Sequence, residues 1–173
     1  MNIVVAQISE EDGLSVRHVY PEGEPGLGEG DVRLIGRAEL RLRATREGNK
    51  VELVGEVNAT AGFECDRCLA AISVPVEQTF DLIYVPPLGA KEERELGLDD
   101  LSTGFYQGDV IDADDVVREQ IELALPMARV CRPDCRGLCP ECGANLNERD
   151  CACKVDQVDS RWAALRELKT KTN

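Results

Sequence analysis

Apolar and polar residues alternate along two neighbouring stretches of the chain, which predicts a pair of β-strands. Over residues 32–44 the even-numbered positions are apolar apart from one glycine, and arginine or glutamate fills most positions between them. After a turn at residues 47–50, the alternation resumes over residues 51–63 with glutamates on the polar side. Such alternation puts one side of a strand on a core and the other in water. We expect the arginines to face the glutamates across the strands, each pair contributing a few tenths of a kcal/mol to about 1 kcal/mol. This interpretation is preferred over an RNA-binding row of arginines.

Further strands are expected on both sides of this pair. Residues 3–9 have the pattern of a short strand. Alternating apolar residues over 72–84 predict a longer one, which must stop at Pro86 and Pro87 because proline cannot donate a ladder hydrogen bond. The acidic residues 86–104, with leucines scattered among charges, predict a long loop.

A helix is predicted after this loop. Asp112 is a typical N-cap residue, and Val117 and Ile121 follow at the spacing of one buried helical face. Pro126 ends the pattern, since proline cannot continue a helix. A last short helix is expected over residues 160–168, where a tryptophan and two leucines form an apolar stripe.

The net charge is unevenly distributed and narrows the choice of partners. The whole chain carries a formal charge of −13, with 11 basic and 26 acidic residues in 1–128 against 9 and 7 in 129–173. The first part would repel a polyanion, so broad nonspecific nucleic-acid binding is not expected. No stretch approaches the roughly 18 apolar residues that a membrane-spanning helix needs, and the first residues lack an export signal. We expect a cytoplasmic protein that does not engage a membrane.

Eight cysteines accompany a single histidine, His18, which makes metal binding the leading chemistry. Cytoplasmic thiols stay reduced, so disulfides are not the expected use of these residues. Six of the cysteines lie within 23 residues, and each is a candidate metal ligand: Cys131, Cys135, Cys139, Cys142, Cys151 and Cys153.

The segment Cys139-Pro140-Glu141-Cys142-Gly143 has the form of a zinc knuckle, in which two thiolates grip one metal ion from a tight turn. We expect Cys135 and Cys153 to complete a site for one structural Zn²⁺. Four thiolates leave no open coordination position, so the site would be structural rather than catalytic. The number of metal ions, one or two, stays open at this point.

The earlier pair, Cys65 and Cys68, lies between two predicted strands and forms half a metal site. The leading interpretation is a possible second site, shared with thiols of the later group. A metal bound between two chains, a redox pair, and two small residues at a strand turn remain as alternatives.

Together these patterns predict an α+β protein. It would comprise a curved antiparallel sheet or partial β-barrel, one packed helix and a C-terminal zinc-binding segment. The expected division is 1–128, an acidic β-rich domain with its terminal helix, and 129–173, the cysteine-rich segment with a short C-terminal helix.

The order of these motifs resembles the bacterial YceD family, also called large ribosomal RNA subunit accumulation protein. The resemblance covers roughly residues 32–168 and is most specific from Leu125 to Arg161. It is carried by Cys65-x-x-Cys68, the helix end at residues 121–126, the run from Cys131 to Asn147, Cys151-x-Cys153 and Asp159-x-Arg161.

The resemblance implies a non-enzymatic factor in ribosome biogenesis that promotes accumulation of large-subunit ribosomal RNA. Its expected partner is that RNA or a basic ribosomal protein of the assembling subunit, with no small-molecule substrate; the oligomeric state is left open. Two alternatives are a cytosolic thiol oxidoreductase using Cys65 and Cys68, and an iron-thiolate electron carrier. The carrier is disfavoured because a rubredoxin-like site needs two matching knuckles, and the sequence indicates only the one at Cys139.

Overall fold

A six-stranded sheet forms the body of the molecule in the computed structural model, which describes residues 1–24, 27, 32–87 and 103–153. Neighbouring strands are antiparallel except for the last pair, which is parallel. The strands in spatial order are β2 (Leu14–Tyr20), β4 (Ala38–Glu47), β5 (Lys50–Glu64), β6 (Ala71–Val85) and β7 (Thr103–Phe105), and β3 (Arg33–Leu34) also pairs with β5.

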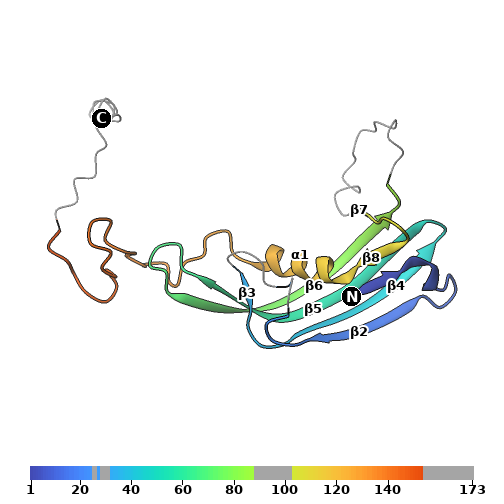
Figure 1. Cartoon of the computed structure of the whole chain (residues 1–173), viewed down its shortest axis with the longest axis horizontal. Coiled ribbons are helices and arrows are strands. Elements are labelled where there is room, and N and C mark those ends of the chain that lie inside the picture. The colour runs from blue at the N-terminus through green and yellow to red at the C-terminus, as the bar shows by residue number, and fades with distance from the viewer. Residues whose placement is uncertain (25–26, 28–31, 88–102, 154–173) are drawn as a thin grey trace, which may run out of the picture.

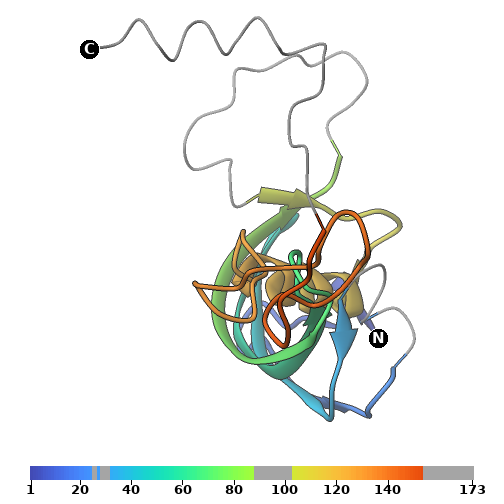
Figure 2. The ribbon, with the colours of Figure 1, turned by 90° about the vertical axis from the view of Figure 1, so that its left-hand side faces the viewer.

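The smaller elements complete an α+β fold. A two-stranded sheet joins β1 (Asn2–Val4) to β8 (Val110–Asp112), and a 3₁₀ turn, η1, follows β1 over Val5–Gln7. The helix α1 spans Ala113–Ala124. Figure 1 shows α1 lying along the curved sheet, and Figure 2 shows the strands bending around it. The large sheet is open, with β2 and β7 at its two ends.

The core lies between α1 and the sheet. Val116, Val117 and Ile121 of the helix are buried in one cluster with Leu40 of β4 and Leu53 of β5. Helix α1 starts where predicted, because the Asp112 side chain accepts a hydrogen bond from the backbone N–H of Asp114 at 2.9 Å. Within the described residues, no helix has the length and apolar content needed to cross a membrane.

The predicted cross-strand pairing of arginine with glutamate is confirmed at Arg41, whereas Arg43 stands opposite Val54 and Arg33 opposite Gly62. Arg41 of β4 stands opposite Glu56 of β5, and their side chains form an ion pair at 3.4 Å. Glu39 bonds both Arg41, at 2.9 Å, and Arg17, at 2.6 Å. Arg41, and Arg17 on the neighbouring β2, therefore have carboxylate partners across the strands.

Several expectations differ from the structure at the margins of the sheet. The expected strand 3–9 is shorter, because the chain turns into η1 after Val4. The strand β2 was not predicted: its inward positions alternate with polar residues and include His18, so its apolar signal is weak. The expected loop 86–104 ends early, since Thr103–Phe105 pairs with β6 in parallel and makes the sheet not wholly antiparallel. Residues 88–102 of that loop and the expected last helix lie outside the described residues.

A close approach between strands fixes one glycine. A Cβ atom at Gly55 would lie 2.5 Å from the backbone oxygen of Arg41 and 2.7 Å from the ring of Phe80. Because the backbone oxygen belongs to a paired strand, it cannot move aside without breaking the ladder.

We expect Gly55→Ala to lower the free energy of unfolding by about 1 to 3 kcal/mol, the usual cost of overpacking. Urea unfolding measures this change. Val54→Thr is the matched control, because Val54 is exposed and threonine keeps the branched shape; its effect should stay within about 0.5 kcal/mol. Equal effects of the two substitutions would contradict the steric explanation.

Candidate metal centre

The eight cysteines form two groups of four in the structure. The first is Cys65, Cys68, Cys131 and Cys135, and the second is Cys139, Cys142, Cys151 and Cys153. Within each group all four sulfur atoms lie within 4.8 Å of one another, so each group could hold a metal ion. We call them the first and the second sulfur site.

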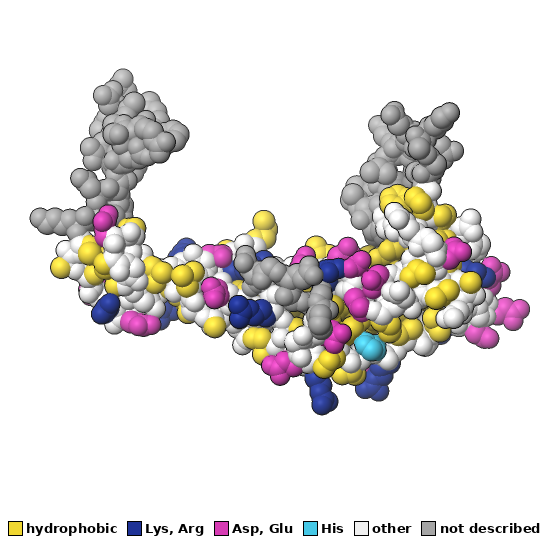
Figure 3. Space-filling view, in the orientation of Figure 1, with side chains coloured by type: hydrophobic (Ala, Val, Ile, Leu, Met, Phe, Trp, Pro, Cys, Tyr) yellow, Lys and Arg dark blue, Asp and Glu magenta, His cyan; other side chains and the backbone are white. Residues whose placement is uncertain are grey.

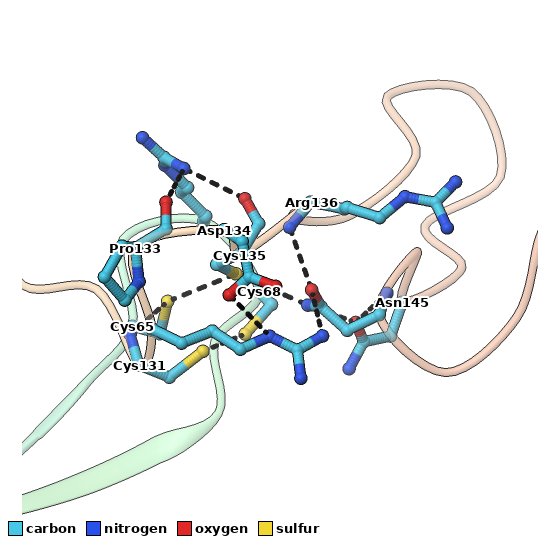
Figure 4. A network of polar contacts seen from close by, with 11 residues as sticks. Cys65, Cys68, Cys131, Pro133, Asp134, Cys135, Arg136 and Asn145 are labelled. Carbon is cyan, nitrogen blue, oxygen red and sulfur yellow. Dashed lines mark hydrogen bonds and ion pairs between the residues drawn. The ribbon is translucent and has the colours of Figure 1, made fainter.

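The first sulfur site has the dimensions of a tetrahedral metal centre (Figure 4). The sulfur of Cys65 is 3.9 Å from that of Cys135, and the sulfur of Cys68 is 3.7 Å from that of Cys131. A metal with bonds of about 2.3 Å to four sulfurs gives edges of about 3.8 Å. Disulfides would require about 2.05 Å, and all four thiols are free.

Backbone contacts bring the two halves of the first site together. Cys65 and Cys68 occupy the turn between β5 and β6, whereas Cys131 and Cys135 follow α1. Asp66 N–H donates to the Arg129 carbonyl at 2.8 Å, and the Arg129 N–H donates back to the Asp66 carboxylate at 3.0 Å. The segment after α1 is thus held against this turn before any metal is considered.

A second set of contacts involves Arg67, at the tip of the same turn. Its guanidinium donates to the carbonyl of Cys135 at 2.9 Å, and its own carbonyl accepts from the Leu138 N–H at 2.9 Å. Gly137 passes so close that an added Cβ would lie 2.9 Å from the Arg67 oxygen, with φ at +74°. This position therefore requires glycine.

The second sulfur site is built from one short stretch of chain. Its ligands lie between Cys139 and Cys153, and they surround a turn in which Cys139 is buried while Cys142 is exposed. A bridge between Leu138 and Asn145 and the bond from Leu146 N–H to the Gly137 carbonyl, 2.9 Å, close this loop. The site is local, whereas the first one joins distant parts of the chain.

The two Cys-x-x-Cys turns have the same backbone geometry. The N–H of Leu69 donates to the Cys65 carbonyl, and that of Gly143 to the Cys139 carbonyl, both at 2.9 Å. In both turns the N–H of the first cysteine also donates, at 2.8 Å, to the carbonyl two residues after the second cysteine. Leu69 and Gly143 both have left-handed backbones, with φ of 59° and 70°. Cys65 and Cys68 therefore form a second knuckle, which the sequence concealed because leucine stands in the glycine position.

The sequence profile described as "Large ribosomal RNA subunit accumulation protein YceD" matches residues 53–169, a stretch that contains all eight cysteines. The chain belongs to the YceD family.

Relatives of this family occur in bacteria and plants. A Mycobacterium tuberculosis protein named as uncharacterised is 33% identical over 130 residues, which cover 75% of this chain and 60% of the relative. The Arabidopsis thaliana protein "Large ribosomal RNA subunit accumulation protein YCED homolog 1, chloroplastic" is 23% identical over 173 residues, with 87% and 50% covered. Bacillus subtilis YlbN is 25% identical over 142 residues, with 80% and 77% covered. The chain thus spans about 60% of the mycobacterial relative's length, and no solved structure matches it.

The grouping of ligands in this YceD-family chain differs from the expected one. Cys135 lies with Cys65, Cys68 and Cys131 rather than with Cys139, Cys142 and Cys153, and Cys151 takes the fourth place in the second site. The reason is the Arg67 turn, which holds the chain on both sides of Gly137 and leaves Cys135 on the first site's side. The leading interpretation of Cys65 and Cys68, a site shared with later thiols, agrees with this geometry.

Each sulfur site contains a thiol whose pKa is lowered to near neutral pH, and in the first site the pKa of Cys135 is lowered as well. Burial would raise the pKa of Cys65, but backbone N–H groups of Cys131, Arg67 and Cys68 outweigh it and lower the pKa to about 6. Backbone N–H groups at Cys142 and Glu141 lower the pKa of Cys139 to about 7. A thiolate near neutral pH gives a metal ion its first ligand.

The opposite shift occurs at two cysteines of each site: the pKa is raised at Cys68 and Cys131 in the first and at Cys151 and Cys153 in the second. Burial and the neighbouring Cys135 sulfur raise the pKa of Cys131 to about 12. The Cys142 sulfur, followed by burial, raises the pKa of Cys153 to about 12. Gathering four thiolates without a cation is thus unfavourable, and a bound cation would relieve the repulsion.

The paired knuckles predict opposite effects of two substitutions. Nothing lies within 4 Å of a Cβ at Gly143, so Gly143→Ala changes only the left-handed backbone preference and should cost about 1 kcal/mol. Leu69→Gly relieves the same penalty, and because Leu69 is 58% exposed it forfeits little burial. We expect this variant to gain up to about 1 kcal/mol. Urea unfolding of both metal-loaded variants is the measurement, and a loss of stability in both would contradict the explanation.

Proposed function

We propose that this chain is a non-enzymatic factor, acting in the cytoplasm, that promotes accumulation of large-subunit ribosomal RNA and so contributes to ribosome assembly. The observation that carries the proposal is the YceD profile match over residues 53–169. The plant relatives from Arabidopsis thaliana and Zea mays bear the same description in their names. The matched range contains most of the β5–β6 hairpin, α1 and the cysteines of both sulfur sites.

The chemistry of the cysteines supports binding rather than catalysis. Four sulfurs around one metal leave no open position for a substrate or water. Cys65 and Cys68 occupy a turn between two strands, whereas the redox pair of a thioredoxin opens a helix. Each of their sulfurs also faces a sulfur of the later segment. The two knuckles belong to different sites, so neither site has the paired knuckles of a rubredoxin.

The uneven distribution of net charge favours a basic protein as the partner of the sheet, and any contact with RNA is expected at the cysteine segment. Residues 1–128 carry the acidic excess, which attracts a basic ribosomal protein and repels RNA. Residues 129–173 carry a small basic excess and could approach RNA. On the face drawn in Figure 3, basic and acidic side chains are interspersed rather than gathered by sign. This arrangement suits specific docking better than nonspecific attraction to a polyanion.

The metal we propose for both sites is Zn²⁺. It favours four tetrahedral thiolates at about 2.3 Å, which fits the sulfur spacings of the first site. When bound, it would supply folding free energy to a segment that has few apolar side chains.

Protein purified under reducing conditions should contain about two equivalents of zinc per chain and absorb no visible light. Elemental analysis and the absorption spectrum measure this directly. Cys65→Ser and Cys142→Ser should each remove about one equivalent, because the substituted residues belong to different sites. A coloured, iron-containing protein would contradict the assignment. So would the loss of both zinc equivalents in either single variant.

Depletion of the protein in its native cell tests the role in RNA accumulation. We expect the ratio of large-subunit to small-subunit ribosomal RNA to fall, and the wild-type chain to restore it. The same cells carrying Cys139→Ser determine whether the second sulfur site is needed. An unchanged ratio in cells shown to lack the protein would refute the proposed function while leaving the metal sites unaffected.

A further inference from the structure

Asn147 connects the two sulfur sites. It lies between Cys142 and Cys151, in the loop that the second site closes. Its side-chain nitrogen nevertheless donates to the sulfur of Cys135, a ligand of the first site, at 3.3 Å. A residue positioned by one site therefore contacts a ligand of the other.

The orientation of the Asn147 amide is determined by its other contacts. Its side-chain oxygen accepts from the Arg136 backbone N–H at 2.8 Å and from the Arg132 guanidinium at 2.9 Å. Both are obligate donors, so the oxygen must face them and the NH₂ group must face the sulfur. The same NH₂ group donates to Asn145 at 2.9 Å, which ties it to the turn of the second site.

We propose that the two sites are coupled through Asn147, so that metal binding at the second site strengthens metal binding at the first. The proposal rests on the zinc assignment above. Closing the second loop places the amide on Cys135, where an N–H donor offsets thiolate charge and stabilises the metal-bound form. Because equilibrium coupling is reciprocal, metal at the first site strengthens the second by the same factor.

Asn147 is suited to this role because substitution can remove it. The other N–H groups that lower the pKa values of Cys65 and Cys135 belong to the backbone. The remaining side-chain link between the sites is the Arg136–Asp150 ion pair at 2.5 Å. Both of its side chains are largely exposed, and exposed pairs contribute little. Among the side-chain contacts of the described residues, Asn147 is therefore the one through which coupling is expected.

The experiment is a double-mutant cycle on the full chain, with zinc affinity measured by competition against a chromophoric chelator. One variant, Cys142→Ser with Cys153→Ser, disables the second site. It should weaken zinc binding at the first site about tenfold or more. Losing a hydrogen-bond partner of a metal ligand usually lowers the metal affinity by about 10- to 100-fold. Asn147→Ala should produce a similar loss with the second site intact. The combined variant should be little worse than either.

Two further variants separate donation to sulfur from a merely structural role. Asn147→Asp keeps acceptors for Arg132 and Arg136 but replaces the donor with a negative oxygen, so it should weaken the first site at least as much as alanine. Arg149→Ala, an exposed change in the same loop, is the control and should leave both affinities unchanged. In cobalt-loaded protein, the sulfur-to-metal absorption of the first site should shift with Asn147→Asp and not with Arg149→Ala.

The outcomes distinguish this inference from the zinc assignment. Losses that simply add in the combined variant, or an aspartate variant equal to wild type, would overturn the coupling through Asn147 while zinc remains bound. A wild-type chain with no zinc would overturn the assignment itself. At saturating zinc the Asn147→Ala chain should still bind about two equivalents, and failure to do so would show a loss of structure instead of coupling.

Discussion

The geometry of residues 129–153 depends on sulfur, because the segment has almost no apolar core of its own. Around Cys65, Cys68 and Cys135 the packed aliphatic side chains are Ile72, Val130 and Leu138. Each such side chain contributes at most about 1.5 to 3 kcal/mol, against an ordering cost of 1 to 2 kcal/mol for every residue's backbone. Burial therefore cannot hold the segment. Besides the hydrogen bonds to the β5–β6 turn, the proposed metal binding would be the main further source, because its free energy is folding free energy in such segments.

The first sulfur site extends this dependence to the sheet. Cys68 and Cys131 enclose β6, β7, β8 and α1, so a metal there closes a long loop of chain. Closing a long loop is entropically costly, but here much of that cost is met before the metal binds. The β5–β6 ladder runs to Glu64 and Ala71, and Arg129 already bonds the turn through Asp66. The four cysteines are consequently brought together by the hairpin register and the end of α1, and a bound metal would fix an arrangement that strand pairing has prepared.

How much the sequence revealed depended on the range of the interactions. Local patterns were sufficient for the β4–β5 hairpin, its Arg41–Glu56 pair and the capped helix, because period and capping act between near neighbours. Local patterns did not predict β2, because its inward side chains are buried only through pairing with β4. The second knuckle was concealed by Leu69, which adopts a left-handed backbone that leucine seldom takes. The division of ligands required knowing that the β5–β6 turn and the segment after α1 meet, which spacing along the chain does not contain.

The two sites differ in how far apart in the sequence their cysteines lie, and this difference determines how each site affects the other. The second site folds a short stretch around one knuckle, while the first pins that stretch to the sheet, as the chain path at one end of the body in Figure 1 illustrates. Were the sites independent, loss of the second site would free only its own loop. Because Asn147 contacts Cys135, the same loss also removes a donor from the clamp that joins the segment to the sheet. A partner that touches both the acidic sheet and the cysteine segment would therefore depend on both metals, even if it contacted only one of the sites.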